Sequence, residues 1–148
     1  MHRLVEERGV AKEWEIDSAG TYGGHAGDLP DRRMRVHASR RGYNLTHRAR
    51  RITVDDFEYF DMIVAMDDAN RDDLRRMART LDEARKVTMI GPRIRFNRHY
   101  DYVPDPYYEG SEGFELVLDL LEDACENLLD EIVESVDVEG NQYNKQEE

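Results

Sequence analysis

The sequence is poor in cysteine and has no long apolar run. Its one cysteine, Cys125, excludes an internal disulfide framework and a cysteine-rich zinc site. Such sparse cysteine is typical of a reducing compartment, so we expect a cytoplasmic protein. No apolar run approaches the roughly 20 residues of a membrane span, and the charged segment after Met1 does not resemble a signal peptide. We therefore expect no membrane partner.

Positive charge is also scarce, because 21 basic residues stand against 33 acidic ones and the net charge is -12. This balance argues against a nucleic-acid partner, which normally meets a basic face. The charge is unevenly distributed: residues 1–100 carry 20 basic residues, whereas residues 101–148 carry one basic and 16 acidic residues. We interpret residues 101–148 as a solvated acidic helix with a tail. An alternative interpretation is that residues 1–100 form a basic surface that receives an anionic substrate.

Helical and extended patterns alternate along the chain. Apolar spacing and capping residues predict helices over residues 1–8, 31–41, 53–59 and 67–79, and from 114 onward. Apolar runs predict strands over residues 13–19, 61–66 and 86–90, with a long loop over 91–112. This alternation predicts the α/β class with a doubly wound parallel sheet. We expect one domain over residues 1–136 and a disordered acidic tail over 137–148.

The most unusual local sequence is the loop over residues 103–110, VPDPYYEG. Two prolines restrict the backbone on either side of Asp105 and would hold its carboxylate rigidly. A general acid must be fixed in this way, within hydrogen-bond reach of a leaving oxygen. Tyr107 and Tyr108 follow and can line one wall of a cleft. The composition alone also fits a proline-rich turn with surface aromatics.

Four segments together resemble the low-molecular-weight protein tyrosine phosphatases. They are IDSAGT at 16–21, HRARRIT with DDF at 47–57, DMIVAMD at 61–67 and VPDPYY at 103–108. They occur in the family's order and at about its spacing, and the resemblance extends from residue 1 to about residue 133. The Asp-Pro-Tyr-Tyr element is specific to that family. The resemblance implies a four-stranded parallel sheet with helices on both faces, the phosphotyrosine phosphatase I-like fold.

The resemblance also implies a reaction that needs no metal and no cofactor. A cysteine in a Cys-x5-Arg loop attacks phosphorus, and an aspartate protonates the leaving phenolate and then activates water. By position, Asp105 would be this acid and base, and Tyr107 and Tyr108 would flank the substrate cleft. The residues that would support the phosphate loop or the cleft floor are Ser18, His47 and Asp67. The implied partner is a phosphotyrosine protein or a small aryl phosphate.

One departure from the family pattern is serious, because the 148 residues contain no Cys-x5-Arg. Cys125 is followed six residues later by Glu131 and lies on the apolar stripe predicted for the last helix, where it would pack as a small hydrophobe. In the family pattern, the first strand and the phosphate loop come before the part that this sequence matches, so they would precede Met1. We therefore expect a tyrosine phosphatase whose true start lies upstream, and whose 148 residues alone are inactive.

Two other interpretations stay open at this stage. One is a non-catalytic, phosphatase-like interaction protein, and a less favoured one is a relative of the arsenate reductases that share the fold. In the family the first strand is central in the sheet, so its loss exposes strand edges and apolar faces. We therefore expect a marginal, oligomeric or rearranged fold, with homo-oligomers as one outcome.

Overall fold

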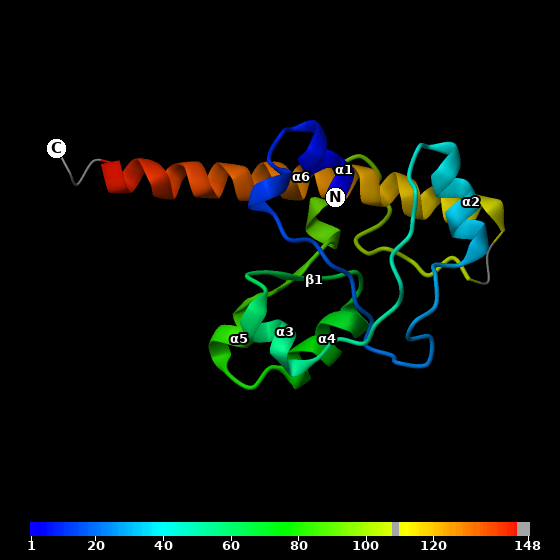
Figure 1. The fold of residues 1–148 in the computed structure, drawn as a ribbon, viewed down its shortest axis with the longest axis horizontal. Coiled ribbons are helices and arrows are strands. Elements are labelled where there is room, and N and C mark those ends of the chain that lie inside the picture. The colour runs from blue at the N-terminus through cyan, green and yellow to red at the C-terminus, as the bar shows by residue number, and fades with distance from the viewer. Residues whose placement is uncertain (108–109, 145–148) are drawn as a thin grey trace.

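The computed structural model describes residues 1–107 and 110–144 and has the predicted α/β class with a parallel sheet. The strands are β1 (Ile63–Ala65) and β2 (Val87–Met89). The helices are α1 (His2–Glu7), α2 (Arg32–Arg40), α3 (Val54–Tyr59), α4 (Asp68–Met77), α5 (Leu81–Arg85) and α6 (Ser111–Asn144), with 3₁₀ turns η1 (Ala11–Glu13) and η2 (Gly91–Arg93). Figure 1 shows the sheet between the long α6 and the group formed by α3, α4 and α5.

The two strands run parallel, and their side chains point alternately to two hydrophobic clusters. Ile63 and Ala65 of β1 pack with Phe57 of α3 and Leu74 of α4. Val64 instead packs against the cluster that α6 contributes on the opposite face. Helices therefore cover both faces of the sheet, as the resemblance implies, whereas the sheet of the described residues has two strands and not the four that the resemblance implies.

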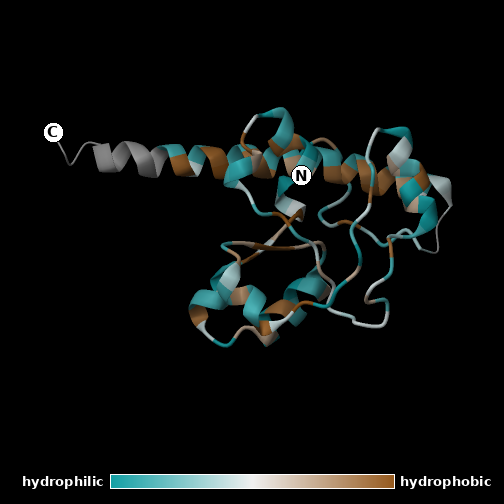
Figure 2. Ribbon diagram, in the orientation of Figure 1, coloured by the Kyte–Doolittle hydropathy of each residue, from teal (hydrophilic) through white to brown (hydrophobic). Residues whose placement is uncertain are grey.

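Apolar residues recur along α6, as Figure 2 shows. Helix α6 contributes most of the buried residues of the cluster that Val64 packs against, namely Val117, Leu120, Ala124 and Leu128. The sequence pattern correctly places Phe114 and Leu128 in the interior, but it misses Leu120 and Leu129, which are both fully buried. The buried stripe is wider than predicted because α6 packs against several elements at once, including α2 and η2.

The strand predicted over residues 13–19 is absent, and this prediction was wrong. Residues 11–13 form η1, the backbone is extended at Trp14, and only Gly20 makes an isolated parallel bridge, to Arg51. A strand needs a hydrogen-bonded neighbour, and within the described residues β1 pairs with β2 alone. With no partner strand beside them among the described residues, residues 14–19 form an irregular segment.

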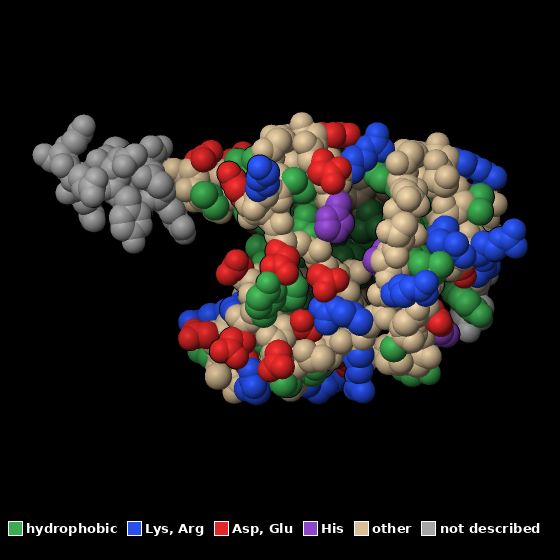
Figure 3. Space-filling view, in the orientation of Figure 1, with side chains coloured by type: hydrophobic (Ala, Val, Ile, Leu, Met, Phe, Trp, Pro, Cys, Tyr) green, Lys and Arg blue, Asp and Glu red, His purple; other side chains and the backbone are tan. Residues whose placement is uncertain are grey.

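Within the described residues β1 pairs with β2 alone, so its other edge has no strand partner, and the predicted exposure of strand edges stays a prediction. Figure 3 shows a hollow in one face of the molecule, with hydrophobic side chains at its floor and a histidine at its edge.

The predicted helices over residues 1–8, 31–41, 53–59 and 67–79 are present. The sequence patterns did not predict α5 or η2, each of which spans five residues or fewer.

The C-terminal helix is longer than its apolar stripe. Helix α6 is described as far as Asn144 and so enters the segment 137–148, whose disorder stays a prediction. Residues 145–148 lie outside the described part of the chain. Among the described residues, no helix is both long and apolar enough to cross a bilayer.

The start of α3 is held by a buried carboxylate. Asp56 accepts hydrogen bonds from the Thr53 N–H at 2.8 Å and from two guanidinium nitrogens of Arg50 at 2.9 and 3.0 Å. Thr53 and Asp56 complete the capping box that the sequence indicates. The Arg50 guanidinium is the main reason why the pKa of Asp56 lies below its ordinary value, since it favours the charged carboxylate.

We expect Asp56→Asn to lower the free energy of unfolding by about 2 kcal/mol at neutral pH, the range of hydrogen bonds to charged groups. Because the folded-state pKa is depressed, this contribution is present above the unfolded pKa of about 3.9 and disappears as pH falls through the folded value. Urea unfolding at neutral and acidic pH should therefore show a difference from wild type that shrinks in acid. Asp55→Asn, at an exposed position one residue earlier, is the control. Equal losses for both variants would contradict the assignment.

Candidate functional site

The loop that precedes α6 is attached to the carboxyl ends of both strands. Val103 is buried, and its N–H donates to the Met66 carbonyl just after β1 at 2.9 Å. Gly91, which follows β2, lies so close to Asp101 that an added Cβ would fall 1.8 Å from the Asp101 carbonyl oxygen. In open α/β sheets, ligands bind outside the carboxyl ends of the strands. The loop therefore lies where such a fold places its chemistry.

Asp105 is exposed at this loop, between two prolines that fix its backbone. Its Oδ1 accepts a hydrogen bond from the Tyr107 N–H at 3.0 Å, which fixes the direction of the carboxylate. Among the described residues, nothing hydrogen-bonds to its second oxygen. The arrangement has the fixed, accessible carboxylate that the sequence predicts, and such a group can exchange a proton with a bound molecule.

Tyr107 beside it is more than half exposed and is positioned by α2. The Arg33 guanidinium carbon lies 5.5 Å from the centre of the Tyr107 ring and 4.8 Å from that of Phe114. Arg33 also donates to the Tyr107 carbonyl at 3.3 Å, and Asp31 holds the same guanidinium at 2.9 Å. Sequence reasoning missed Arg33, because only the packing of α2 brings it to this loop. Tyr108 lies outside the described residues.

Asp67 lies at the same end of the sheet. It follows Met66, the residue that binds the loop through Val103, and its Oδ1 accepts the Asn70 N–H at 2.7 Å. This bond caps α4, which is one of the two roles that the sequence suggests. The structure thus brings Asp67 to the carboxyl end of the sheet with the Asp105 loop, and a role for it in the cleft stays a prediction.

Ser18 and His47 belong to two segments that lie side by side. The Gly20 N–H donates to the Arg50 carbonyl and the Ile52 N–H donates to the Gly20 carbonyl, both at 2.9 Å. Both side chains are exposed, and neither forms a hydrogen bond with another described residue. No hydrogen bond among the described residues joins these two segments to the loop of Asp105. The structure therefore brings Ser18 and His47 to neighbouring segments, and their role stays a prediction.

Cys125 is half-buried on α6, as the apolar stripe predicts. Burial is the main cause that raises the pKa of its thiol, because it disfavours the charged thiolate. A thiol with a raised pKa is a poor nucleophile at neutral pH. In the described ranges, no group of three or more His, Cys, Asp or Glu side chains is arranged to hold a metal ion.

Comparisons with known proteins agree with one another. The sequence profile described as "Low molecular weight phosphotyrosine protein phosphatase" matches residues 1–139. A Synechocystis protein named for the same class is 42% identical over 137 residues, which cover 87% of this chain and 82% of that protein. A low molecular weight protein-tyrosine-phosphatase of Streptomyces coelicolor is 38% identical over 90% of this chain and 82% of its own. The crystal structure of a protein tyrosine phosphatase from Entamoeba histolytica superposes with a TM-score of 0.87 at 34% identity, covering 90% of this chain and 85% of that one.

Proposed function

Because the chain belongs to the low molecular weight phosphotyrosine protein phosphatase family, we propose that it carries the general acid of phosphotyrosine hydrolysis. In this proposal the acid is Asp105. The single observation that carries it is the fixed, exposed carboxylate at the carboxyl end of the sheet, held by two prolines and the Tyr107 N–H. The substrate is a phosphotyrosine protein or a small aryl phosphate.

The proposed reaction has two steps in which Asp105 exchanges a proton. In the first, a cysteine thiolate attacks phosphorus, the bond to the phenolic oxygen breaks, and Asp105 protonates that oxygen. In the second, Asp105 takes a proton from the water that attacks the phosphocysteine, which releases phosphate and the thiolate. Tyr107 and Tyr108 would flank the aryl ring. The residues proposed to support the phosphate loop and the cleft floor are Ser18, His47 and Asp67.

The nucleophile of this reaction is not among the 148 residues, which contain no Cys-x5-Arg. General acid catalysis supplies about 10²–10⁴-fold, whereas phosphate-monoester hydrolysis needs accelerations of up to ~10²¹-fold. The acceleration that Asp105 alone can supply is therefore far smaller than the reaction needs. We propose that these residues do not hydrolyse phosphotyrosine by themselves and that activity requires a Cys-x5-Arg segment joined to them.

The direct test is an assay of the 148-residue chain with p-nitrophenyl phosphate. The expected result is no release of p-nitrophenol above the rate in buffer. Asp105→Asn is assayed in parallel, and Asp101→Asn controls for loss of a neighbouring exposed carboxylate. Turnover that disappears in Asp105→Asn and persists in Asp101→Asn would show that the chain is an enzyme without the loop, and would overturn the proposed inactivity.

The absence of the loop from these residues also favours a second candidate, a phosphatase-like interaction protein. The unpaired edge of β1 is a surface through which copies could associate. Light scattering coupled to gel filtration would test this, with a mass above 17.4 kDa in solution as the expected result. A monomer that unfolds cooperatively and reversibly would contradict self-association through this edge.

A further inference from the structure

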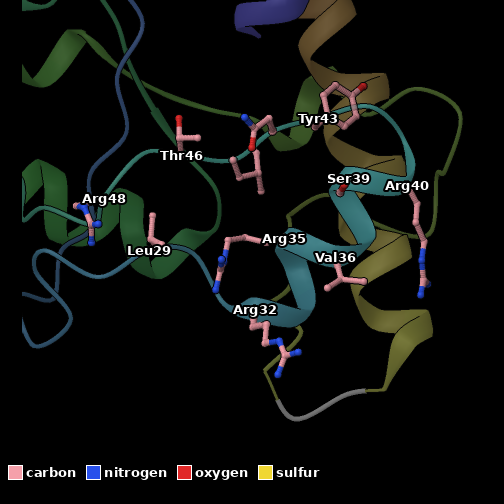
Figure 4. Close-up of a pocket in the computed structure, with 11 residues that line it drawn as sticks. Leu29, Arg32, Arg35, Val36, Ser39, Arg40, Tyr43, Thr46 and Arg48 are labelled. Atoms are coloured by element: carbon pink, nitrogen blue, oxygen red, sulfur yellow. The ribbon is translucent and has the colours of Figure 1, made fainter.

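A pocket beside α2 is lined by four arginines. Figure 4 shows Arg32, Arg35 and Arg40 on α2, and Arg48 on the segment that follows it. Residues three, four and seven apart lie on the same face of a helix, so the α2 residues of the pocket form one continuous surface. None of the described residues that line the pocket is acidic. This is unusual in a chain whose net charge is -12.

The positive charge of the pocket is not neutralised by neighbouring carboxylates. Arg32 and Arg40 make no hydrogen bond or ion pair with another described residue, while Arg35 and Arg48 donate only to the backbone carbonyls of Pro30 and Gly27, at 3.0 and 2.9 Å. Elsewhere in the described part of the chain, ten arginines do pair with carboxylates: Arg3, Arg8, Arg33, Arg41, Arg50, Arg71, Arg76, Arg79, Arg85 and Arg93. The four arginines of the pocket therefore carry positive charge that no ion pair with a described carboxylate neutralises, and two of them, Arg32 and Arg40, also make no hydrogen bond.

The pocket also offers apolar and hydrogen-bonding surface. Leu29 and Val36 line it and are 38% and 42% exposed. The hydroxyls of Ser39 and Thr46 add neutral hydrogen-bonding groups. A single small anion would leave most of this surface uncovered, whereas a peptide with acidic and apolar side chains would use both kinds of surface.

We propose that this pocket is a docking site for an acidic peptide segment of a partner protein. Guanidinium groups form charge-assisted, often bidentate hydrogen bonds with carboxylates. The strongly negative remainder of the chain repels long polyanions such as nucleic acids but leaves a short segment free to bind locally. The lining of the pocket includes none of Asp105, Tyr107 and Arg33, so the peptide-binding groups proposed here are different from those of the proposed acid site.

The test measures binding of a short fluorescein-labelled peptide of alternating glutamate and leucine by fluorescence anisotropy, with a glutamine–leucine peptide as the neutral probe. The pocket variant is R32Q/R40Q, which removes two arginines that make no hydrogen bond or ion pair with another described residue. The matched control is R75Q/R98Q, which removes the same charge at two exposed positions outside the pocket, again without an ion pair among the described residues. Circular dichroism verifies that both variants are folded.

The expected result is that R32Q/R40Q raises the Kd for the acidic peptide at least about tenfold, and R75Q/R98Q less than about twofold. Raising the ionic strength from about 0.01 M to about 0.15 M shortens the Debye length from about 30 Å to about 8 Å and should weaken binding of the acidic peptide only. Equal losses in the two variants, equal binding of the neutral peptide, or no binding at all would overturn the proposal. Tighter binding of a short single-stranded RNA, lost in R32Q/R40Q, would assign the pocket to nucleic acid instead.

Discussion

Joining a strand–Cys-x5-Arg–helix segment to the N-terminus of these 148 residues should produce an aryl phosphatase, and Asp105→Asn should then lower its kcat about 10²–10⁴-fold. The added segment supplies the nucleophile and the backbone N–H groups that bind phosphate at a helix N-terminus. Asp105 supplies the proton for the leaving phenolate. An asparagine keeps the size of the side chain but cannot donate that proton as an acid.

The identity of the substrate separates acid catalysis from a structural effect. Phenyl phosphate needs protonation of its leaving group, whereas p-nitrophenol is acidic enough to depart with much less help. The loss in Asp105→Asn should therefore be larger for phenyl phosphate, and it should appear in kcat rather than in KM. Asp101→Asn, also an exposed aspartate of this loop, should change kcat little. Equal losses with the two substrates, or the same loss in Asp101→Asn, would contradict the role of Asp105.

The second large effect is expected at Gly91. A Cβ at this position would lie 1.8 Å from the Asp101 carbonyl oxygen and 2.7 Å from its carbonyl carbon, and both atoms are backbone. Gly91→Ala therefore forces the loop of Asp105 away from β2. We expect the free energy of unfolding to fall by about 3 kcal/mol or more, as for other severe overpacking. Urea unfolding followed by circular dichroism measures this change.

Gly20→Ala is the matched control, because its Cβ would meet only the Tyr22 backbone, at the ordinary contact distance of 3.6 Å. We expect this variant to change the free energy of unfolding by less than about 1 kcal/mol. In the joined chain, Gly91→Ala should also lower phosphatase activity, since it displaces the segment that carries Asp105. Unchanged stability of Gly91→Ala would show that the close approach of Gly91 and Asp101 does not hold the loop.

Local chemistry made several features of the fold predictable. Thr53 and Asp56 form a capping box whose side chains satisfy N–H groups within the same turn. Asp31 and Asp67 cap α2 and α4 for the same reason. The positive φ of Gly42 at the end of α2 fits the helix stop that a glycine indicates. These caps join residues two or three positions apart, so the local sequence contains all of their partners.

Features that depend on distant partners were not predictable. Residues 13–19 have the apolar pattern of a strand, but a strand forms only beside another strand, and the described chain places none there. Leu120 and Leu129 are buried because α6 contacts several elements, which its own periodicity does not reveal. Arg33 reaches Tyr107 across 74 positions of sequence.

The sequence by itself determined the α/β class, the family, and the fixed carboxylate of Asp105 between two prolines, because these depend on local patterns and motif order. Only the tertiary structure decided which side chains meet. It attached the Asp105 loop to both strand ends through Val103 and Gly91, and it gathered four arginines in one pocket without an acidic partner among the lining residues. The physical reason is that hydrogen bonds, close packing and charge pairing act through space, between residues that chain order alone does not bring together.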